Sequence, residues 1–551
     1  MIKKDSLLKG TVVLAAAALI ARFLGIFQRV PLDYLLDPAG IKYFNLANTL
    51  YLFLLVIATA GIPSTVSKMV SERYAQGRVA EAQQVYRAAL LFGGVTGLII
   101  SALLFVTAPF ITAHISKFPG AKLAVQAIAP SLLLFPVLAM MRGYFQGRQM
   151  MSAGAISQIV EQVLRVVSAI GLLLLLLGLG YSNEWLAAGA AAGSVAGSIG
   201  AFVVMLWYAR KLRRQDAAER LAQAAAAAQG VGDPSRKLKL SAIYGEIFRM
   251  AVPIVMTAAT VQFLYMVDVT LFVRMTAGFY DAAQAELVVG WLGNRAQPLA
   301  SIPPILAIAL SQSIIPAISS AYAVRNMAEV QRQGSLAMRI VLFTGIPAAL
   351  ALTVAAVSVT GFIFEDAQGS LIVAALTAGT IFQITMMTSN SMLFGLGKPR
   401  APMLHTMWGM AVKVAGSLVL GPLLGVYGLI LASTLCFVLV TTLNLRAIRA
   451  EVSLDVLGGR WARYAGAVLL TAAAGVGVEW GARTLLAPLP DKLGYFFSAA
   501  ICGVVILGLY LAGLVLLRVV TPAETAGFPG PVRKLFGLLF RVLPTARRAR
   551  G

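Results

Sequence analysis

Charged residues are scarce in this sequence of 551 residues. Only 12% of the residues are Asp, Glu, Lys or Arg, whereas 59% are hydrophobic. A soluble globular domain carries about 25% charged residues, so this composition excludes a soluble protein of this size. It predicts an all-α polytopic membrane protein.

Cysteine and histidine are nearly absent. The two cysteines, Cys436 and Cys502, lie in apolar runs, so no disulfide framework is indicated. The two histidines, His114 and His405, lie far apart and lack the spacing of metal ligands. The sequence also contains no nucleotide-binding P-loop. We therefore expect no enzyme, no bound metal and no other cofactor.

Apolar runs dominate the chain, and a membrane-spanning helix needs about 20 such residues. We expect about fourteen transmembrane helices, at residues 8–35, 43–70, 85–113, 123–145, 152–179, 185–209, 246–275, 286–320, 333–362, 368–395, 400–421, 425–445, 463–487 and 493–518. The first run is too long for a signal peptide, so we keep it as a span.

The net charge of +23 is distributed unevenly along these spans. If the N-terminus is cytoplasmic, most Lys and Arg residues fall in inner connections and in the tail. The outer loops hold five: Lys42, Lys117, Lys122, Arg483 and Lys492. This asymmetry predicts a multi-pass protein with both termini in the cytoplasm. Nucleic-acid binding is not needed to explain the basic charge.

Short segments recur at an offset of about 250 residues. AEAQQ at 80–84 resembles AEVQR at 328–332, and LFGG at 91–94 resembles LFTG at 342–345. Six spans separate the members of each pair, so the repeats have the same orientation. We expect two pseudo-symmetric six-helix lobes around a central cavity, followed by two additional C-terminal helices.

The repeat divides the chain into five expected segments. They are an N-lobe at 1–209, a cytoplasmic linker at 210–245, a C-lobe at 246–445, two additional spans at 446–520, and a basic amphipathic cytoplasmic tail at 521–551. In the tail, the spacing of a helix would place Leu and Phe on the face opposite Arg and Lys. That pattern favours a short helix on the inner leaflet, with a disordered tail as the alternative.

Arg22 and Arg29 interrupt the first apolar run. Their spacing of seven residues places them on one helix face, about 10 Å apart along the axis. A charge at the bilayer centre costs on the order of 3 kcal/mol, so each should face a cavity or a partner. Arg29 could instead pair with Asp33 or extend to the outer interface. We expect both arginines to face a water-filled cavity and an anionic substrate.

Arg295 lies in WLGNRAQPLASIPPI (291–305), where prolines free backbone carbonyls and favour bending. We expect it to face the first-lobe arginines, and an outer-interface arginine is the alternative. Asp268, in the seventh span, could balance the charge of Arg295 or Arg274, or bind a coupling cation. Structural pairing is the favoured role of Asp268.

Two further groups of charges have structural explanations. Glu161 and Arg165 are four residues apart on one helix, which predicts an ion pair inside the lobe. Lys68 and Glu72 lie with Arg73 at the inner end of the second span. They could form an inner gate or a solvated helix end.

Five motifs resemble one family of transporters: ARFLGIFQRVPL, GIPSTVSKMVSE, MRGYFQG, ISQIVEQVLRV and SNSMLFGLGK. They are similar to the polysaccharide-transporter branch of the multidrug/oligosaccharidyl-lipid/polysaccharide (MOP) flippase superfamily. Within that branch the sequence resembles the stage V sporulation protein B-like group of Gram-positive bacteria, which includes MurJ-type lipid II flippases. The resemblance covers nearly the whole chain.

This resemblance implies a fourteen-helix transporter of the bacterial cell membrane with a V-shaped central cavity. Such proteins move an undecaprenyl-diphosphate-linked peptidoglycan precursor from the inner to the outer leaflet by alternating access. The arginines that bind the diphosphate correspond to Arg22, Arg29 and Arg295 here. The implied partners are this precursor, the lipid bilayer and other envelope-synthesis proteins. Coupling to Na⁺ or H⁺ stays open.

Four alternative functions remain at this stage. The first is a flippase for another lipid-linked polysaccharide unit, including a sporulation role. The second, a cation-coupled multidrug exporter, would favour buried carboxylates, whereas this chain has more intramembrane arginines. The third, a membrane glycosyltransferase or ligase, would need acids in an outer loop, and Asp33, Asp37, Glu365 and Asp366 have no suggestive spacing. The fourth is a scaffold for envelope assembly.

Overall fold

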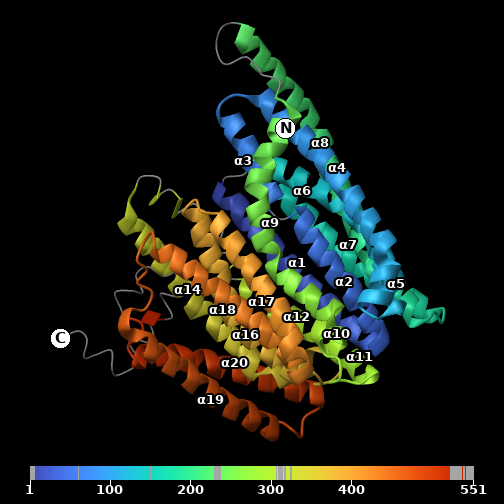
Figure 1. Cartoon of the computed structure of the whole chain (residues 1–551), viewed down its shortest axis with the longest axis vertical. Helices are drawn as coiled ribbons and strands as arrows, with labels where there is room; N and C mark the ends of the chain where they lie inside the picture. Colours follow the sequence, from blue (N-terminus) through green and yellow to red (C-terminus); the bar gives the residue numbers. More distant parts are fainter. Residues whose placement is uncertain are drawn as a thin grey trace. The chain divides into compact units, whose positions relative to one another are not determined.

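The computed structural model contains only helices, turns and loops in the part of the chain that it describes (Figure 1). That part comprises residues 7–59, 61–148, 150–228, 238–305 and 325–521, with the short stretches 307, 314–315, 318–319, 321–322, 536–537 and 540. The expected all-α membrane class is confirmed.

Twelve candidate membrane spans occur among the described residues, each long and apolar enough to cross a bilayer. They correspond to the expected second to seventh and ninth to fourteenth spans. The eighth expected span includes residues outside the described part, and many side chains of the first, on the helix Leu7–Leu35, lie outside it as well. The count of fourteen therefore stays a prediction.

The chain separates into two compact units, Met1–Met275 with Asp281–Gly293, and Thr276–Tyr280 with Asn294–Gly551. The helices of the first unit are α1 (Leu7–Leu35), α2 (Pro38–Thr59), α3 (Ile62–Ala75), α4 (Val79–Phe110), α5 (Lys122–Ile128), α6 (Ser131–Gly147), α7 (Met151–Gly178), α8 (Asn183–Ala228), α9 (Leu240–Thr270), α10 (Phe272–Met275) and α11 (Ala282–Gly290). The first unit extends past the expected lobe boundary at residue 209 because α9 packs against α2. The division into six-helix lobes stays a prediction.

The second unit contains the remaining described α-helices. They are α12 (Gln297–Ala300), α14 (Met327–Val354), α15 (Ala356–Ile363), α16 (Ser370–Gly395), α17 (Arg400–Leu424), α18 (Val426–Arg449), α19 (Trp461–Leu485) and α20 (Asp491–Leu516). A π-helical segment, η3 (Trp291–Ala296), contains the boundary between the two units along the chain.

Glycine allows α7 and α8 to pack closely. A Cβ atom on Gly193 would lie 2.6 Å from the Arg165 carbonyl oxygen, and one on Gly197 would lie 2.6 Å from that of Glu161. Glycines four residues apart lie on one helix face, and this spacing permits close helix contact in membranes. The same contact places the backbone of the expected Glu161–Arg165 pair directly against α8.

The expected second span, 43–70, is divided into α2 and α3 in the structure. Gly61, between them, has a φ of +71°, which L side chains rarely adopt. A Cβ atom there would also lie 2.8 Å from Cβ of Ile254 on α9. The glycine therefore lets the chain turn while remaining in contact with α9.

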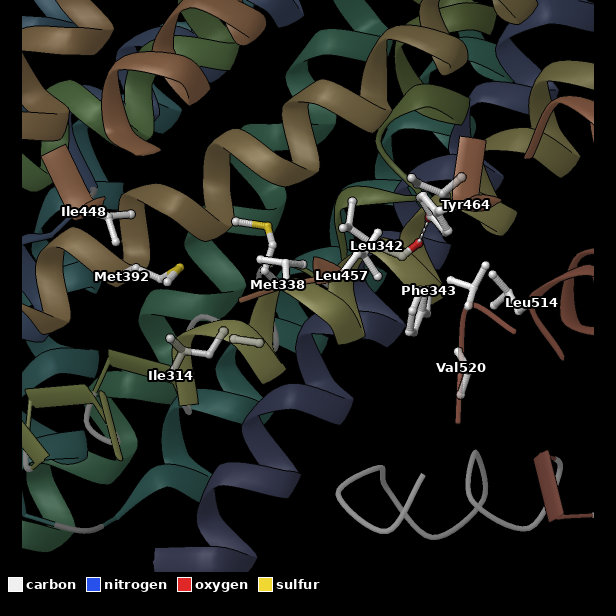
Figure 2. Packing of buried hydrophobic residues seen from close by; sticks show 14 of the residues in the cluster. Ile314, Met338, Leu342, Phe343, Met392, Ile448, Leu457, Tyr464, Leu514 and Val520 are labelled. Carbon is white, nitrogen blue, oxygen red and sulfur yellow. Dashed lines mark hydrogen bonds between the residues drawn. The ribbon is translucent and has the colours of Figure 1, made fainter. Parts of the chain in front are cut away.

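The hydrophobic core of the second unit joins its last two helices to α14 (Figure 2). The Tyr464 hydroxyl on α19 donates to the Leu342 carbonyl at 3.1 Å and lies 3.0 Å from the Tyr510 hydroxyl of α20. These bonds satisfy polar groups that would otherwise be buried without partners. Phe536, from the expected tail, is 1% exposed in this core, and most of the tail lies outside the described residues.

Replacing Gly197 with Leu should destabilise the first unit, because the added side chain would collide with the α7 backbone. Overpacking of this kind costs about 1–3 kcal/mol. The expected result is a lower unfolding temperature of the purified protein in detergent. Gly171, also on α7, has open space around it and provides the matched control, Gly171→Leu. Equal effects of the two substitutions would contradict this account of the α7–α8 contact.

Candidate functional site

Arg29 occupies the candidate site of the first unit. Its Nη1 donates to Asn45 Oδ1 on α2 at 2.7 Å and to the Gly293 carbonyl at 3.5 Å. The guanidinium carbon lies 5.2 Å from the ring centroid of Phe44, which suits a cation–π contact. These three contacts fix the orientation of the guanidinium group, which is half-buried.

The proline-rich segment approaches Asn45 through a glycine. A Cβ atom on Gly293 would lie 2.8 Å from Asn45 Cγ, so only glycine fits this position without displacing the amide. The segment is π-helical, and Pro298 follows it. Proline cannot donate an N–H group to the preceding turn, and π-helical turns are frequent at functional sites. A π-helical segment thus precedes Pro298, and the bend expected from the prolines stays a prediction.

Arg295 lies within the second unit and has an acidic partner. It is 5% exposed, and its Nη1 donates to Asp366 Oδ1 at 2.5 Å and to the Gln368 carbonyl at 2.8 Å. Its guanidinium carbon lies 5.5 Å from the ring centroid of Phe364. The sequence did not reveal this partner, because 71 residues separate the two. The arginine is paired in this conformation, so a role in substrate binding stays a prediction.

Asp366 lies in the loop between α15 and α16, outside the spans. Partial burial, the largest single influence, raises the pKa of this carboxyl group. The hydrogen bond from Arg295, the hydrogen bond from the Gln368 backbone and the charges of Arg295 and Lys492 together outweigh burial, so the pKa lies below its ordinary value. The pair therefore stabilises the folded state above the ordinary carboxyl pKa. That contribution is lost as the pH falls through the depressed value.

Glu161 and Arg165 form an ion pair with an N–O distance of 3.1 Å. A second arginine, Arg142 on α6, donates to the other Glu161 oxygen at 2.8 Å. Arg165 also donates to the Tyr51 hydroxyl at 2.9 Å. One carboxylate thus serves two guanidinium groups, and the Nε atoms of both arginines are buried without a hydrogen-bond partner. Sequence analysis missed Arg142, although it lies in the MRGYFQG motif.

The expected inner gate is described only in part. Lys68 is exposed, and the side chain of Glu72 lies outside the described residues, as does that of Arg22 on α1. Arg73 is ordered by Glu246 of α9, with an N–O distance of 3.1 Å. The ion pair described at this end of α3 is therefore made by Arg73, the residue after Glu72. A gating role for Lys68 and Glu72 stays a prediction.

Asp268 and Arg274 lie in different surroundings within the first unit. Asp268 on α9 is 1% exposed. Arg274 on α10 is exposed and donates to the backbone carbonyl of His114. Charge balance or cation binding by Asp268 stays a prediction.

The first part of the expected linker is helical, because α8 continues to Ala228. Arg148, 4% exposed at the end of α6, pairs with Asp216 and donates to Glu219 at 2.7 Å. Tyr144 donates to the same Asp216 carboxylate at 3.2 Å. This cluster joins the charged extension of α8 to the C-terminal end of α6. Sequence analysis did not predict it.

Comparison with known proteins supports the relationship suggested by the motifs. A family model described as polysaccharide biosynthesis protein matches residues 7–322. The lipid II flippase MurJ of Bacillus subtilis (strain 168) is 26% identical over 453 residues, which cover 79% of this chain and 81% of the relative. Stage V sporulation protein B of the same strain is 25% identical over 447 residues, covering 80% and 83%.

The fold is also similar to a solved transporter structure. A structure of the lipid II flippase MurJ in an inward closed conformation matches with a TM-score of 0.64 and 14% sequence identity. The match covers 92% of this chain and 99% of the solved chain. At this identity the likeness shows the shared fold alone.

The Arg295–Asp366 pair generates a pH-dependent prediction. The Asp366→Asn variant should unfold at a lower temperature than the wild type at neutral pH, by the equivalent of about 1 kcal/mol or less, because the carboxylate is partly exposed. The difference should shrink as the pH falls below about 4, where the wild-type carboxyl becomes protonated. Thermal unfolding across pH measures it. Asp455→Asn, an exposed acid of the same unit, is the control. A difference that does not change with pH would contradict the assignment.

Proposed function

Because this chain belongs to the polysaccharide biosynthesis protein family, within the MOP flippase superfamily, we propose that it moves a lipid-linked envelope precursor across the membrane. The expected cargo is an undecaprenyl-diphosphate-linked precursor similar to lipid II, moved from the inner to the outer leaflet. The lipid II flippase among its relatives supports this cargo. A different lipid-linked polysaccharide unit is the second candidate, supported by the description of the family model.

The observation that carries the proposal is the position of Arg29. It is a permanent cation on a mostly apolar helix, and Asn45 and the Gly293 carbonyl orient it. A diphosphate loses the hydrogen bonds of its bound water when it enters hydrocarbon, so it can cross only if other groups replace those hydrogen bonds. Guanidinium groups supply that replacement through short charge-assisted hydrogen bonds. We assign Arg29 and Arg22 to the diphosphate on these grounds.

A local excess of positive charge adds support in the same unit. Glu161 is shared by Arg142 and Arg165, so the group carries a net charge of about +1 when all three are ionised. Such a group raises the electrostatic potential for an anion in its unit. It acts on the cargo through this field, and the direct contacts are assigned to the arginines of α1.

Arg295 joins the diphosphate site only after exchanging its present partner. In the structure, Asp366 and the Gln368 carbonyl accept hydrogen bonds from its Nη1. A diphosphate oxygen carries charge comparable to a carboxylate and offers the same acceptor geometry. The proposed cycle therefore includes transfer of Arg295 from Asp366 to the cargo. Rocking of two lobes would expose the cargo to alternate sides, as in other repeat-built transporters.

The membrane potential can drive the outward step. With the inside negative, outward movement of an anion gains about 2.3 kcal/mol per charge for each 100 mV. Coupling to Na⁺ or H⁺ is a separate question, which transport assays with controlled ion gradients answer.

Translocation of a fluorescent lipid II in proteoliposomes tests the proposed function directly. We expect the wild-type protein to move the label between leaflets, and Arg29→Gln to reduce the initial rate by about tenfold or more. The reason is the loss of a charged hydrogen bond worth about 1.5–3 kcal/mol. Arg22→Gln should behave similarly. Arg332→Gln, which removes an exposed arginine paired with Glu329, is the matched control.

The outcomes separate the alternatives. Translocation of another lipid-linked saccharide but not of lipid II would identify a different cargo and leave the proposed mechanism intact. Export of a cationic dye without any lipid translocation would favour a drug exporter, and a change in the covalent structure of the lipid would identify an enzyme. If Arg22→Gln, Arg29→Gln and Arg295→Gln all translocated lipid II at the wild-type rate, the proposed diphosphate site would be contradicted.

A further inference from the structure

A buried carboxylate on α19 lies outside every role described above. Glu479 is 6% exposed, and within the described part of the chain no basic side chain pairs with it. One of its oxygens, Oε1, accepts hydrogen bonds from the Ser358 hydroxyl at 2.6 Å and the Ser358 backbone N–H at 3.2 Å. The other oxygen, Oε2, is buried and has no hydrogen-bond partner.

The two donors come from the start of a helix. The chain leaves helical geometry at Ala355, and Ser358 lies in the first turn of α15. The first N–H groups of a helix lack intrahelical partners and favour an anion. Charge-assisted hydrogen bonds of this kind are stronger to a carboxylate than to a neutral acid. Oε1 therefore has the donors that a carboxylate oxygen needs, whereas Oε2 has none.

Ser498 on α20 faces Glu479 by the register of the two antiparallel helices. Cys502 Sγ lies 3.8 Å from the Gly475 carbonyl, which fixes these residues opposite each other. Glu479 lies about one turn after Gly475 on α19, and Ser498 lies about one turn before Cys502 on α20. Because the two helices are antiparallel, both steps lead in the same direction in space. Ser498 is 0% exposed, and its hydroxyl oxygen also lacks a partner. Two unsatisfied oxygen atoms thus occur on facing turns of α19 and α20.

A cavity of about 350 Å³ reaches this position from the loop between α19 and α20. Its lining includes Ser498, together with Trp480, Arg483, Thr484 and Tyr495. The loop is on the side that the charge distribution assigns to the outside. The cavity therefore borders Ser498, although the hydroxyl itself is buried.

We propose that Glu479 and Ser498 bind a small monovalent cation, with Na⁺ as the fitting species. Glu479 Oε2 and Ser498 Oγ supply oxygen ligands, which hard cations prefer, and water from the cavity completes the shell. A single carboxylate balances one positive charge. A divalent ion would need more acids, and the described residues contain no cluster of three His, Cys, Asp or Glu side chains.

The bound cation has a structural consequence. Ser358 belongs to α15, Glu479 to α19 and Ser498 to α20, so one ion site links three helices of the second unit. A buried carboxylate without a counter-charge would destabilise this junction. Cation binding removes that penalty and stabilises the α19–α20 pair against α15. The inference is independent of the cargo and of the arginines.

Thermal unfolding of the purified full-length protein in detergent tests the site. NaCl and choline chloride are compared at constant ionic strength, and Trp480 fluorescence is recorded as a second signal. Binding to the folded state alone raises stability with the logarithm of free Na⁺ above the dissociation constant. We expect this saturating dependence in the wild type, and its loss in Glu479→Gln.

Two further variants keep the test decisive if Glu479→Gln folds poorly. Ser498→Ala retains the carboxylate, removes one oxygen ligand and should weaken the apparent Na⁺ affinity by about tenfold. Asp491→Asn alters an acid at the surface of the same cavity and should leave the affinity unchanged. No Na⁺ effect in the wild type, or an undiminished effect in both Glu479→Gln and Ser498→Ala, would overturn the proposal. Stabilisation by protons without Na⁺ dependence would overturn it in favour of a protonated Glu479.

Discussion

The cost of an unsatisfied polar group in hydrocarbon is the constraint on which this structure depends. A bilayer core offers no water, so each buried donor, acceptor or charge must find its partner within the protein. Lys413 illustrates the rule: it is 0% exposed on α17 and donates to the Leu429 carbonyl of α18 at 2.8 Å. Arg165 follows the same rule, because it forms an ion pair with Glu161 and donates a hydrogen bond to the Tyr51 hydroxyl. Exceptions to the rule are therefore informative, and Glu479 Oε2 and the Ser498 hydroxyl are such exceptions.

The same constraint connects helix packing to the candidate site. Glycines let α7 approach α8 and let Gly293 approach Asn45, where any larger residue would collide. Close approach brings backbone carbonyls within reach of cationic side chains, as the Gly293 carbonyl and Arg29 show. The backbone is irregular in the π-helical turn before Pro298. In this turn the Gly293 carbonyl accepts a hydrogen bond from Arg29, outside the hydrogen-bond pattern of a regular α-helix. The close approach at Gly293 and the orientation of the Arg29 guanidinium group therefore depend on each other.

Features with a short sequence separation could be predicted. Hydrophobic runs give the helices, and the spacing of Glu161 and Arg165 gives a pair whose charged groups lie 3.1 Å apart. Contacts between distant segments could not be predicted, because spacing carries no information about them. Arg142 reaches Glu161 across 19 residues, and Arg295 reaches Asp366 across 71. The turn at Gly61 had a local signal, since glycine two residues before a proline favours a break, but the apolar run around it concealed the break.

The central claim is that arginines on α1 bind the diphosphate of a lipid-linked cargo. The most direct measurement compares the binding of undecaprenyl diphosphate and of undecaprenol, which lacks phosphate, to the purified protein by native mass spectrometry. The account predicts much tighter binding of the diphosphate, with the difference falling by about tenfold or more in Arg29→Gln. Equal binding of the two lipids by the wild-type protein would contradict it.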